Sequence, residues 1–427
     1  LARGSNLAKN LTSAALLGGT TLASIGDIGT ASIRLNEIGV PFFEANLSVL
    51  GGLIPEAVGG RGGRRTGEAR EIADSLGVGM DALMASVQSR WLGNDALDGQ
   101  GASAVSWLMR VTGMNWMNDS LKTAVGISLS NFIAKQAGKK FDDLDVSLRS
   151  EMEAYGLTPE DFDLMNSVVR EVDGIKYHDI SAIDDVDAQI RINGFFTGFA
   201  DSAILTPGGR SNIVTRGLER GTVMSEFKNL FMHLKSFSIT YGMEILSRGF
   251  SKANEGHRTG MLVKILMTSM VYGYIASTLK DLAKGKEPIN VAENPGKVFY
   301  RSLMQAGGLG FYGDTLMGMV AGDARFGEGF AEIAGGPVVG NLSRAAKIPK
   351  MVFDEDYDRA GQTGYRIAKS MLPGANIFYA RMALDYLLFW NMSEYLNPGW
   401  ARNYERRIKD ETGQEFFDAI RPTEAVR

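Results

Sequence analysis

The sequence predicts an all-α, elongated fold in which many helices are separated by Gly-rich breaks. Apolar residues recur at a spacing of about 3.6 along most of the chain, whereas alternating stretches rich in β-branched residues are scarce. Glycine accounts for 52 of the 427 residues, about 12 %, against an average of ~7 %. Small residues let helix backbones approach closely, so we expect helices that pack through glycine and alanine.

The chain is expected to begin with a packed helix and turn. Residues 10–26 carry no charge, and Gly18-Gly19 and Gly26 interrupt the apolar run that a signal peptide requires. The chain opens with Leu1 instead of Met, so we expect it to be part of a longer protein.

Glycine and proline divide the rest of the chain. The sequence GGRGGRRTG at 59–67 is the best linker candidate, because Gly is flexible and the arginines keep it solvated. Further breaks are expected at 206–210 and 285–296. We therefore predict four parts: an N-terminal small-residue helical segment (1–60), a helical domain (61–206), central apolar helices (207–285) and a C-terminal helical region (286–427).

Two helix starts are expected in the second part. Thr158 is a capping residue, Pro159 stands at the first helical position, and Asp161 follows the cap by three residues. In the same way, the loop 140–145 leads into a helix at 146–155.

The third part contains an apolar stripe on the helix predicted at 226–248. Apolar side chains recur there at i, i+3, i+4 and i+7, which places them on one helical face. We predict that five of them are packing and assembly residues: Phe227, Phe231, Leu234, Phe237 and Tyr241.

A second apolar helix is expected at 261–279. It has 19 residues and a single charge, Lys264, near its start. About 20 apolar residues span a bilayer, and a terminal Lys reaches the interface, so one interpretation is a membrane-spanning helix. The other interpretation is a helix buried in a helical core, which the hydroxyl residues within the segment favour.

The C-terminal part contains a basic helix. The sequence Asn-Pro-Gly at 397–399 ends one helix, since Pro lacks an N–H and Gly tolerates positive φ. Three basic residues of the following helix share a face at i, i+4 and i+7, and they are our candidates for contact with DNA or another polyanion: Arg402, Arg406 and Lys409. The alternative is a solvated helix whose basic residues pair internally with Glu405 and Asp410.

We find no catalytic, cofactor or metal site in the sequence. Cysteine is absent, and the three histidines are far apart and outside any HExxH pattern. The sequence GLGFYG at 308–313 fits G-x-G-x-x-G, but the segment before it is predicted to be helical and not the strand that a dinucleotide site needs. A Ser–His–Asp triad is spatial, and sequence alone leaves it open.

The segment EYLNPGWARNYERRIKDETGQEFF at 394–417 resembles the C-terminal region of the internal virion (DNA-ejection) proteins of short-tailed bacteriophages. Those proteins often carry the pattern LNPG…RR…ETGQ…FF. Two further segments are similar to the family. Residues 226–248 look like its FxxFKSF helix, from which Leu234 departs, and residues 16–27 look like its small-residue helix.

This resemblance implies a mechanical role and no enzymatic activity in these residues. Proteins of the family leave the virion interior ahead of the genome and help to form a conduit for DNA across the host cell envelope. The implied partners are further copies of the chain, other ejection proteins, the genome DNA and the host membrane. A net charge of −4 suits such a conduit, because a near-neutral wall lets DNA slide instead of holding its phosphates.

Two other functions stay open at this point. Relatives of the family often carry a peptidoglycan-cleaving domain, so the chain is alternatively a segment of a wall-cleaving virion enzyme. A buried Glu with a raised pKa in a cleft would distinguish that enzyme. The other alternative is a membrane-inserted pore protein, in which residues 261–279 would face lipid.

Overall fold

The computed structural model describes residues 19–58, 74–78, 107, 110–172, 175–204, 258–305, 330–372 and 374–426. These residues are largely helical, which confirms the predicted all-α class. In the described part of the chain, the strands are the short antiparallel pair β1 (Val169–Val172) and β2 (Ile175–His178), in which Val169 lies opposite His178.

The helices fall into three groups along the chain. The first group comprises α2 (Thr20–Ala23), α3 (Ile25–Glu37), α4 (Phe42–Val58), α8 (Met114–Ala134), η3 (Phe141–Asp143), α9 (Val146–Ala154), α10 (Pro159–Ser167), η4 (Ile180–Ala182) and α11 (Val186–Ala203). The second comprises α16 (Arg258–Leu282) and α17 (Pro295–Gln305). The third comprises α19 (Phe330–Phe353), α20 (Tyr357–Met371), α21 (Arg381–Leu384), the π-helical turn η8 (Asp385–Phe389), α22 (Trp390–Leu396), α23 (Trp400–Thr412), η9 (Asp418–Ile420) and α24 (Pro422–Ala425).

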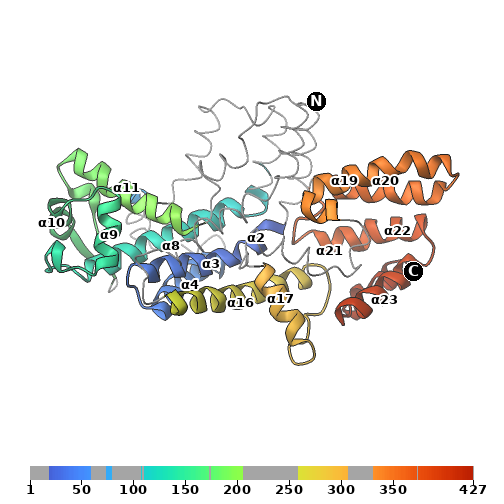
Figure 1. Cartoon of the computed structure of the whole chain (residues 1–427), viewed down its shortest axis with the longest axis horizontal. Helices are drawn as coiled ribbons and strands as arrows, with labels where there is room; N and C mark the ends of the chain where they lie inside the picture. The colour runs from blue at the N-terminus through green and yellow to red at the C-terminus, as the bar shows by residue number, and fades with distance from the viewer. Residues whose placement is uncertain are drawn as a thin grey trace.

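Figure 1 shows how the groups are arranged. Helices α3, α8 and α16 run along the long axis in the middle of the molecule, α9 to α11 lie at one end, and α19 to α23 lie at the other. The breaks predicted at 285–296 and 397–399 fall between α16 and α17 and between α22 and α23. Three other predicted features lie outside the described residues: the linker at 59–67, the break at 206–210 and the apolar stripe from Phe227 to Tyr241.

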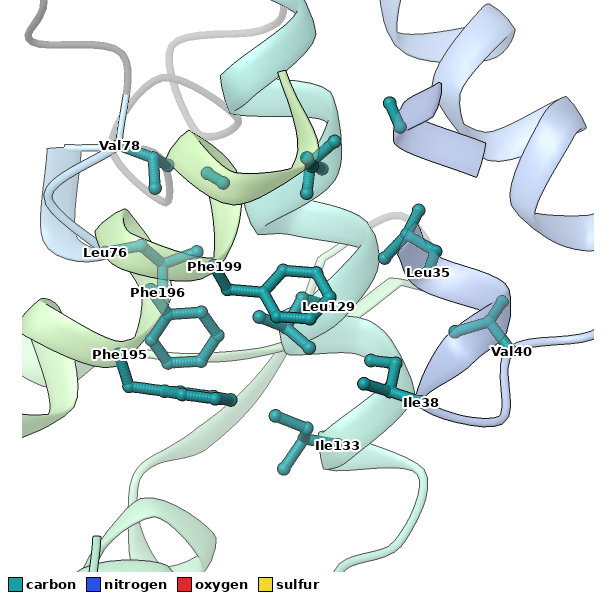
Figure 2. Packing of buried hydrophobic residues seen from close by; sticks show 14 of the residues in the cluster. Leu35, Ile38, Val40, Leu76, Val78, Leu129, Ile133, Phe195, Phe196 and Phe199 are labelled. Carbon is teal, nitrogen blue, oxygen red and sulfur yellow. The ribbon is translucent and has the colours of Figure 1, made fainter. Parts of the chain in front are cut away.

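The main hydrophobic core forms where α11, α8 and α3 meet. Figure 2 shows Phe195, Phe196 and Phe199 projecting from α11 toward Leu129 of α8 and Leu35 of α3. The three phenylalanines are fully buried. Fully burying a side chain of this size stabilises the fold by roughly 1.5–3 kcal/mol, so α11 is fixed to the other two helices mainly through its aromatic face.

The predicted capping signals operate as expected. The Thr158 hydroxyl accepts from the Asp161 N–H at 3.2 Å, and the Asp161 carboxylate accepts from the Thr158 N–H at 3.0 Å. Asp145 caps α9 by accepting from the Ser147 N–H at 2.9 Å. Each cap satisfies backbone N–H groups that have no partner within the helix.

A buried arginine connects α3 to both neighbouring helices. The Arg34 guanidinium pairs with Glu37 at 2.9 Å and with Glu151 of α9, and it donates to the Ser202 hydroxyl of α11 at 2.9 Å. It also lies 4.4 Å above the Phe199 ring. A buried charge without partners would cost several kcal/mol, so these contacts are required for the arrangement of α3, α9 and α11.

Glycines set the close approach of α16 to its neighbours, in line with the expectation of packing through small residues. A Cβ atom on Gly273 would lie 1.9 Å from the Ser302 carbonyl oxygen of α17. A Cβ atom on Gly29 of α3 would lie 3.0 Å from Tyr272 of α16. The Tyr272 hydroxyl, in turn, donates to Asn46 of α4 at 2.9 Å.

Replacement of Gly273 by alanine tests this close packing. Gly273→Ala forces α16 and α17 apart and is expected to destabilise the protein by roughly 1–3 kcal/mol in urea unfolding. Gly260→Ala on the same helix is the matched control, because nothing lies within 4 Å of its added Cβ. The control should be neutral or slightly stabilising. Equal effects of the two changes would contradict the contact.

A pH-dependent stability is expected from Asp27. Burial raises the pKa of its carboxyl to about 7, although a hydrogen bond with Ser24 acts in the opposite direction. The folded state therefore holds the proton more tightly than the unfolded state, so the stability present below about pH 4 is lost as the pH rises through 7. Asp27→Asn should raise the melting temperature clearly at pH 8 and much less at pH 5. An equal shift at both pH values would refute this assignment.

Candidate polyanion-binding site

The segment 394–417 folds as one capped unit in the structure. Helix α22 ends at Leu396 and α23 begins at Trp400, with Gly399 at φ 87° between them. The Glu394 carboxylate accepts from the N–H groups of Gly399 at 2.7 Å and Ala401 at 2.8 Å. An acidic group at this position satisfies free N–H groups and complements the positive end of the helix.

The end of α23 turns back at another glycine. Gly413 takes a φ of 71°, a conformation that favours glycine, and its N–H donates to the Lys409 carbonyl at 2.8 Å. The turn brings Phe416 against Trp390 and Tyr404, with ring centroids 5.8 and 5.7 Å apart. Phe416 and Trp390 are buried, and they form a small C-terminal core with Ile408.

The returning segment docks onto the loop that follows α16. The Glu287 N–H donates to the Glu415 carbonyl at 2.9 Å, and the Phe417 N–H donates to the Gly285 carbonyl at 3.1 Å. The Gln414 side chain donates from Nε2 to both the Asp281 carboxylate and the Glu287 carbonyl, each at 2.8 Å. The Gln and the Phe of the segment therefore attach α23 to the end of α16.

Asp281 is the centre of this junction. It is buried at the end of α16, and Arg301 of α17 donates to its two oxygens at 2.5 and 2.6 Å. With the bond from Gln414, the carboxylate joins three parts of the chain that are far apart in sequence. A bidentate arginine–carboxylate pair is among the stronger polar contacts in proteins, and it fixes orientation as well as distance.

Seven basic side chains surround this junction, and we refer to them as the cation cluster. They come from α16, the loop after it, α17, α20, α21 and α23: Lys280, Lys284, Lys286, Arg301, Lys369, Arg381 and Arg407. Burial lowers the pKa of both Lys280 and Lys284 to about 8. Repulsion from Arg301 adds to the effect at Lys280, and repulsion from Arg381 and Lys286 adds to it at Lys284, where Asp281 acts in the opposite direction. Burial also lowers the pKa of Lys286; attraction to Asp281 acts in the opposite direction, and repulsion from Arg301, Arg381 and Arg407 adds to the lowering.

Two carboxylates neutralise part of the cluster. Asp281 pairs with Arg301, while Asp385 accepts from Lys369 Nζ at 2.7 Å and lies 3.5 Å from Arg381 Nε. Lys284, Lys286 and Arg407 form no ion pair with another described residue. Lys286 and Arg407 instead lie against the aromatic ring of Tyr404, at 5.9 and 5.5 Å from its centroid. The cluster therefore has an excess of positive charge.

The sequence predicts that three basic residues of α23 face a polyanion. All three are exposed on the surface of this helix: Arg402, Arg406 and Lys409. Lys409 pairs with Glu415 at 2.6 Å. Glu405, which the alternative interpretation pairs with these residues, accepts instead from the Thr423 N–H at 2.7 Å. Their contact with a polyanion stays a prediction.

The cation cluster itself was missed by the sequence analysis. Its members are scattered between residues 280 and 407, and no local spacing connects them. The one local signal is the segment Lys284-Gly285-Lys286, two lysines flanking a glycine at a helix end. Gly285 has a φ of 70°, and after this turn Lys286 Nζ lies 5.5 Å from the centroid of the Phe416 ring.

Helix α16 has one packed side and one exposed apolar side. Lys264 donates to Asn36 of α3 at 2.8 Å, and Met261, Ile265 and Tyr272 are buried on the packed side. The exposed side carries apolar residues at every fourth position, between 37 and 55 % exposed: Val263, Met267, Val271, Ile275 and Leu279. Within the described chain, Gly260–Leu282 is the helical segment long and apolar enough to cross a membrane.

A serine and a histidine meet in the N-terminal core. The His178 N–H donates to Ser130 Oγ at 2.9 Å, and that hydroxyl lies 2.9 Å from His178 Nδ1. Both residues are fully buried, Nε2 has no hydrogen-bond partner, and burial lowers the pKa of His178 to about 4. The pair joins α8 to β2 and offers no surface to a substrate.

Chemical sites of other kinds are not evident in the described residues. No group of three or more His, Asp or Glu side chains in the ranges that the structure describes is arranged to hold a metal ion. The G-x-G-x-x-G sequence at 308–313 lies outside those ranges.

Comparison with known proteins gives no relative. No protein-family model, no curated protein and no solved structure matches the chain.

Removal of the Asp281 charge tests the junction. Asp281→Asn keeps the shape of the side chain but leaves Arg301 without its carboxylate partner. We expect a loss of roughly 2–4 kcal/mol in the free energy of unfolding, measured with urea. Asp410→Asn, on the exposed face of α23, is the matched control and should change stability by less than about 0.5 kcal/mol. A loss no larger than that of the control would mean that Asp281 does not hold the junction.

Proposed function

We propose that the chain is a bacteriophage internal virion protein that leaves the capsid and helps to form a conduit for genome DNA across the host cell envelope. The observation that carries this proposal is the segment 394–417, whose sequence resembles the corresponding region of such proteins. Its distinctive residues have physical roles that a family pattern would retain. Glu394 and Gly413 cap α23, while Gln414 and Phe416 attach it to the rest of the protein.

The exposed side of α16 supports assembly as part of this role. Five apolar side chains in a row, with no charge among them, form a surface of the kind that soluble monomers seldom leave uncovered. Further copies of the chain, other ejection proteins or the host membrane are the proposed partners of this surface. In a homo-oligomer around a lumen, several copies of the chain, each with a net charge of −4, would together form a near-neutral wall around the DNA.

A membrane-inserted pore protein is the second candidate. Its support is that α16 has the length and composition of a spanning helix and leaves one apolar side open. Against it, the packed side carries Lys264 and Lys280, which bond to Asn36 and to Gln305. Flotation of the purified chain with vesicles, followed by a carbonate wash, distinguishes the two candidates. A pore protein stays in the vesicle fraction after the wash, whereas a conduit protein that touches the membrane only at its surface is released.

The composition of phage particles tests the proposal directly. Antibodies against the chain, or mass spectrometry, should detect it in filled particles and not in particles that have ejected their DNA. After infection the chain should be found in the host envelope fraction. Retention of the chain in emptied particles, or its absence from filled ones, would overturn the proposal.

The enzyme alternative has its own test. The purified chain is incubated with peptidoglycan, with a known lysozyme as the positive control, and soluble fragments are measured. We expect no release above the level of buffer alone. Cleavage by the purified chain would replace the mechanical role with that of a wall-cleaving enzyme.

A further inference from the structure

The cation cluster is arranged in a way that stability alone does not explain. Lys284 and Lys286 are half-buried beside Arg301 and Arg381, so each of these lysines is repelled by two arginines that are already paired with carboxylates. Burying a charge and placing it near like charges both cost free energy. No carboxylate among the described residues forms an ion pair with either lysine. Asp281 attracts both lysines, but its oxygens are already bonded to Arg301 and Gln414, so an anionic ligand would supply the further counter-charge.

The backbone around Lys286 is fixed by the junction. Lys286 is held by its backbone N–H, which donates to the Asp281 carbonyl at 3.0 Å, and by a bridge to Phe416. Its Nζ lies 5.5 Å from the centroid of the Phe416 ring. Lys286 and Arg407 lie 5.9 and 5.5 Å from the centroid of the Tyr404 ring, so two separate segments bring these charges together. Lys284 lies close enough to Lys286 for their charges to repel each other. Lysine and arginine are the residues that most often bind phosphate oxygens.

The position of the cluster favours nucleic acid over a membrane surface. Lys280 donates to Gln305 of α17, so it lies on the packed side of α16. At about 100° per residue, it is about 180° around the helix from the exposed Val271. A bilayer resting on the exposed apolar side would therefore lie away from the cluster. Arg407 also extends the cluster onto α23, whose outer face carries Arg402 and Arg406, as a ligand with a row of phosphates requires.

We propose that Lys284, Lys286 and Arg407, supported by Arg301 and Arg381, form a binding site for the phosphodiester backbone of nucleic acid. The contacts are made to phosphates alone, and the site is therefore independent of base sequence. The proposal rests on the proposed function and deepens it, because it locates one local DNA contact on a chain whose overall net charge of −4 is otherwise near neutral. It is tested on the purified chain, whereas ejection is tested on particles, so the failure of one is distinguishable from the failure of the other.

The test measures the affinity of the full chain for a double-stranded DNA fragment as a function of salt. In the variant Lys284→Gln/Lys286→Gln, two phosphate contacts are lost. We expect the slope of log affinity against log salt to fall by about two and the affinity to fall roughly tenfold to a hundredfold at low salt. The same change at two exposed lysines of the N-terminal region, Lys139→Gln/Lys140→Gln, should leave both quantities near those of the unchanged chain.

Three further arms make the result decisive. Lys284→Arg/Lys286→Arg keeps the charge and should keep the affinity, which separates loss of contact from loss of folding. Arg402→Gln/Arg406→Gln should have a smaller effect than the change at Lys284 and Lys286. Inorganic phosphate and vesicles containing anionic phosphatidylglycerol are the competing probes. Binding of these probes without binding of DNA would overturn the proposal. So would DNA binding that is absent altogether or unchanged in the Lys284→Gln/Lys286→Gln variant.

Discussion

The C-terminal half of this protein depends on one buried carboxylate. The Asp281 carboxylate accepts hydrogen bonds from Arg301 and from Gln414. It therefore connects the end of α16 to α17 and to the segment that follows α23. Removing a carboxylate from water costs several kcal/mol unless its oxygens are fully bonded. The junction therefore forms only when all three segments are in place, and the positions of Lys284 and Lys286 follow from it.

The sequence was sufficient for those features that depend on near neighbours. Thr158, Pro159 and Asp161 stand within one helical turn, and the cap predicted from them is formed. The Pro-Gly break at 397–399 and the long apolar helix were predictable for the same reason, since backbone conformation and apolar periodicity are local properties. The packing of that helix could not be predicted, because the close contacts of Gly29 and Gly273 depend on the positions of α3, α16 and α17 in the folded protein.

The candidate site shows the opposite case. Arg402, Arg406 and Lys409 could be selected from the sequence because their i, i+4, i+7 spacing places them on one face of a helix. Charged residues at this spacing usually mark a solvent-exposed helix face. The cation cluster combines residues up to 127 positions apart, from Lys280 to Arg407. The net charge of −4 gives no sign of such a local basic cluster. Its existence rests on the docking of Gln414 and Phe416, whose roles are visible only in three dimensions.

Hydrogen–deuterium exchange tests most directly whether this docking exists in solution. The amide of Glu287 bonds to the Glu415 carbonyl, and the amide of Phe417 bonds to the Gly285 carbonyl. Peptides covering these two amides should be protected in the unchanged chain and should exchange much faster in Gln414→Ala, while peptides of α8 keep their protection. Rapid exchange at Glu287 and Phe417 in the unchanged chain would contradict the account, because the cation cluster would then have no fixed scaffold.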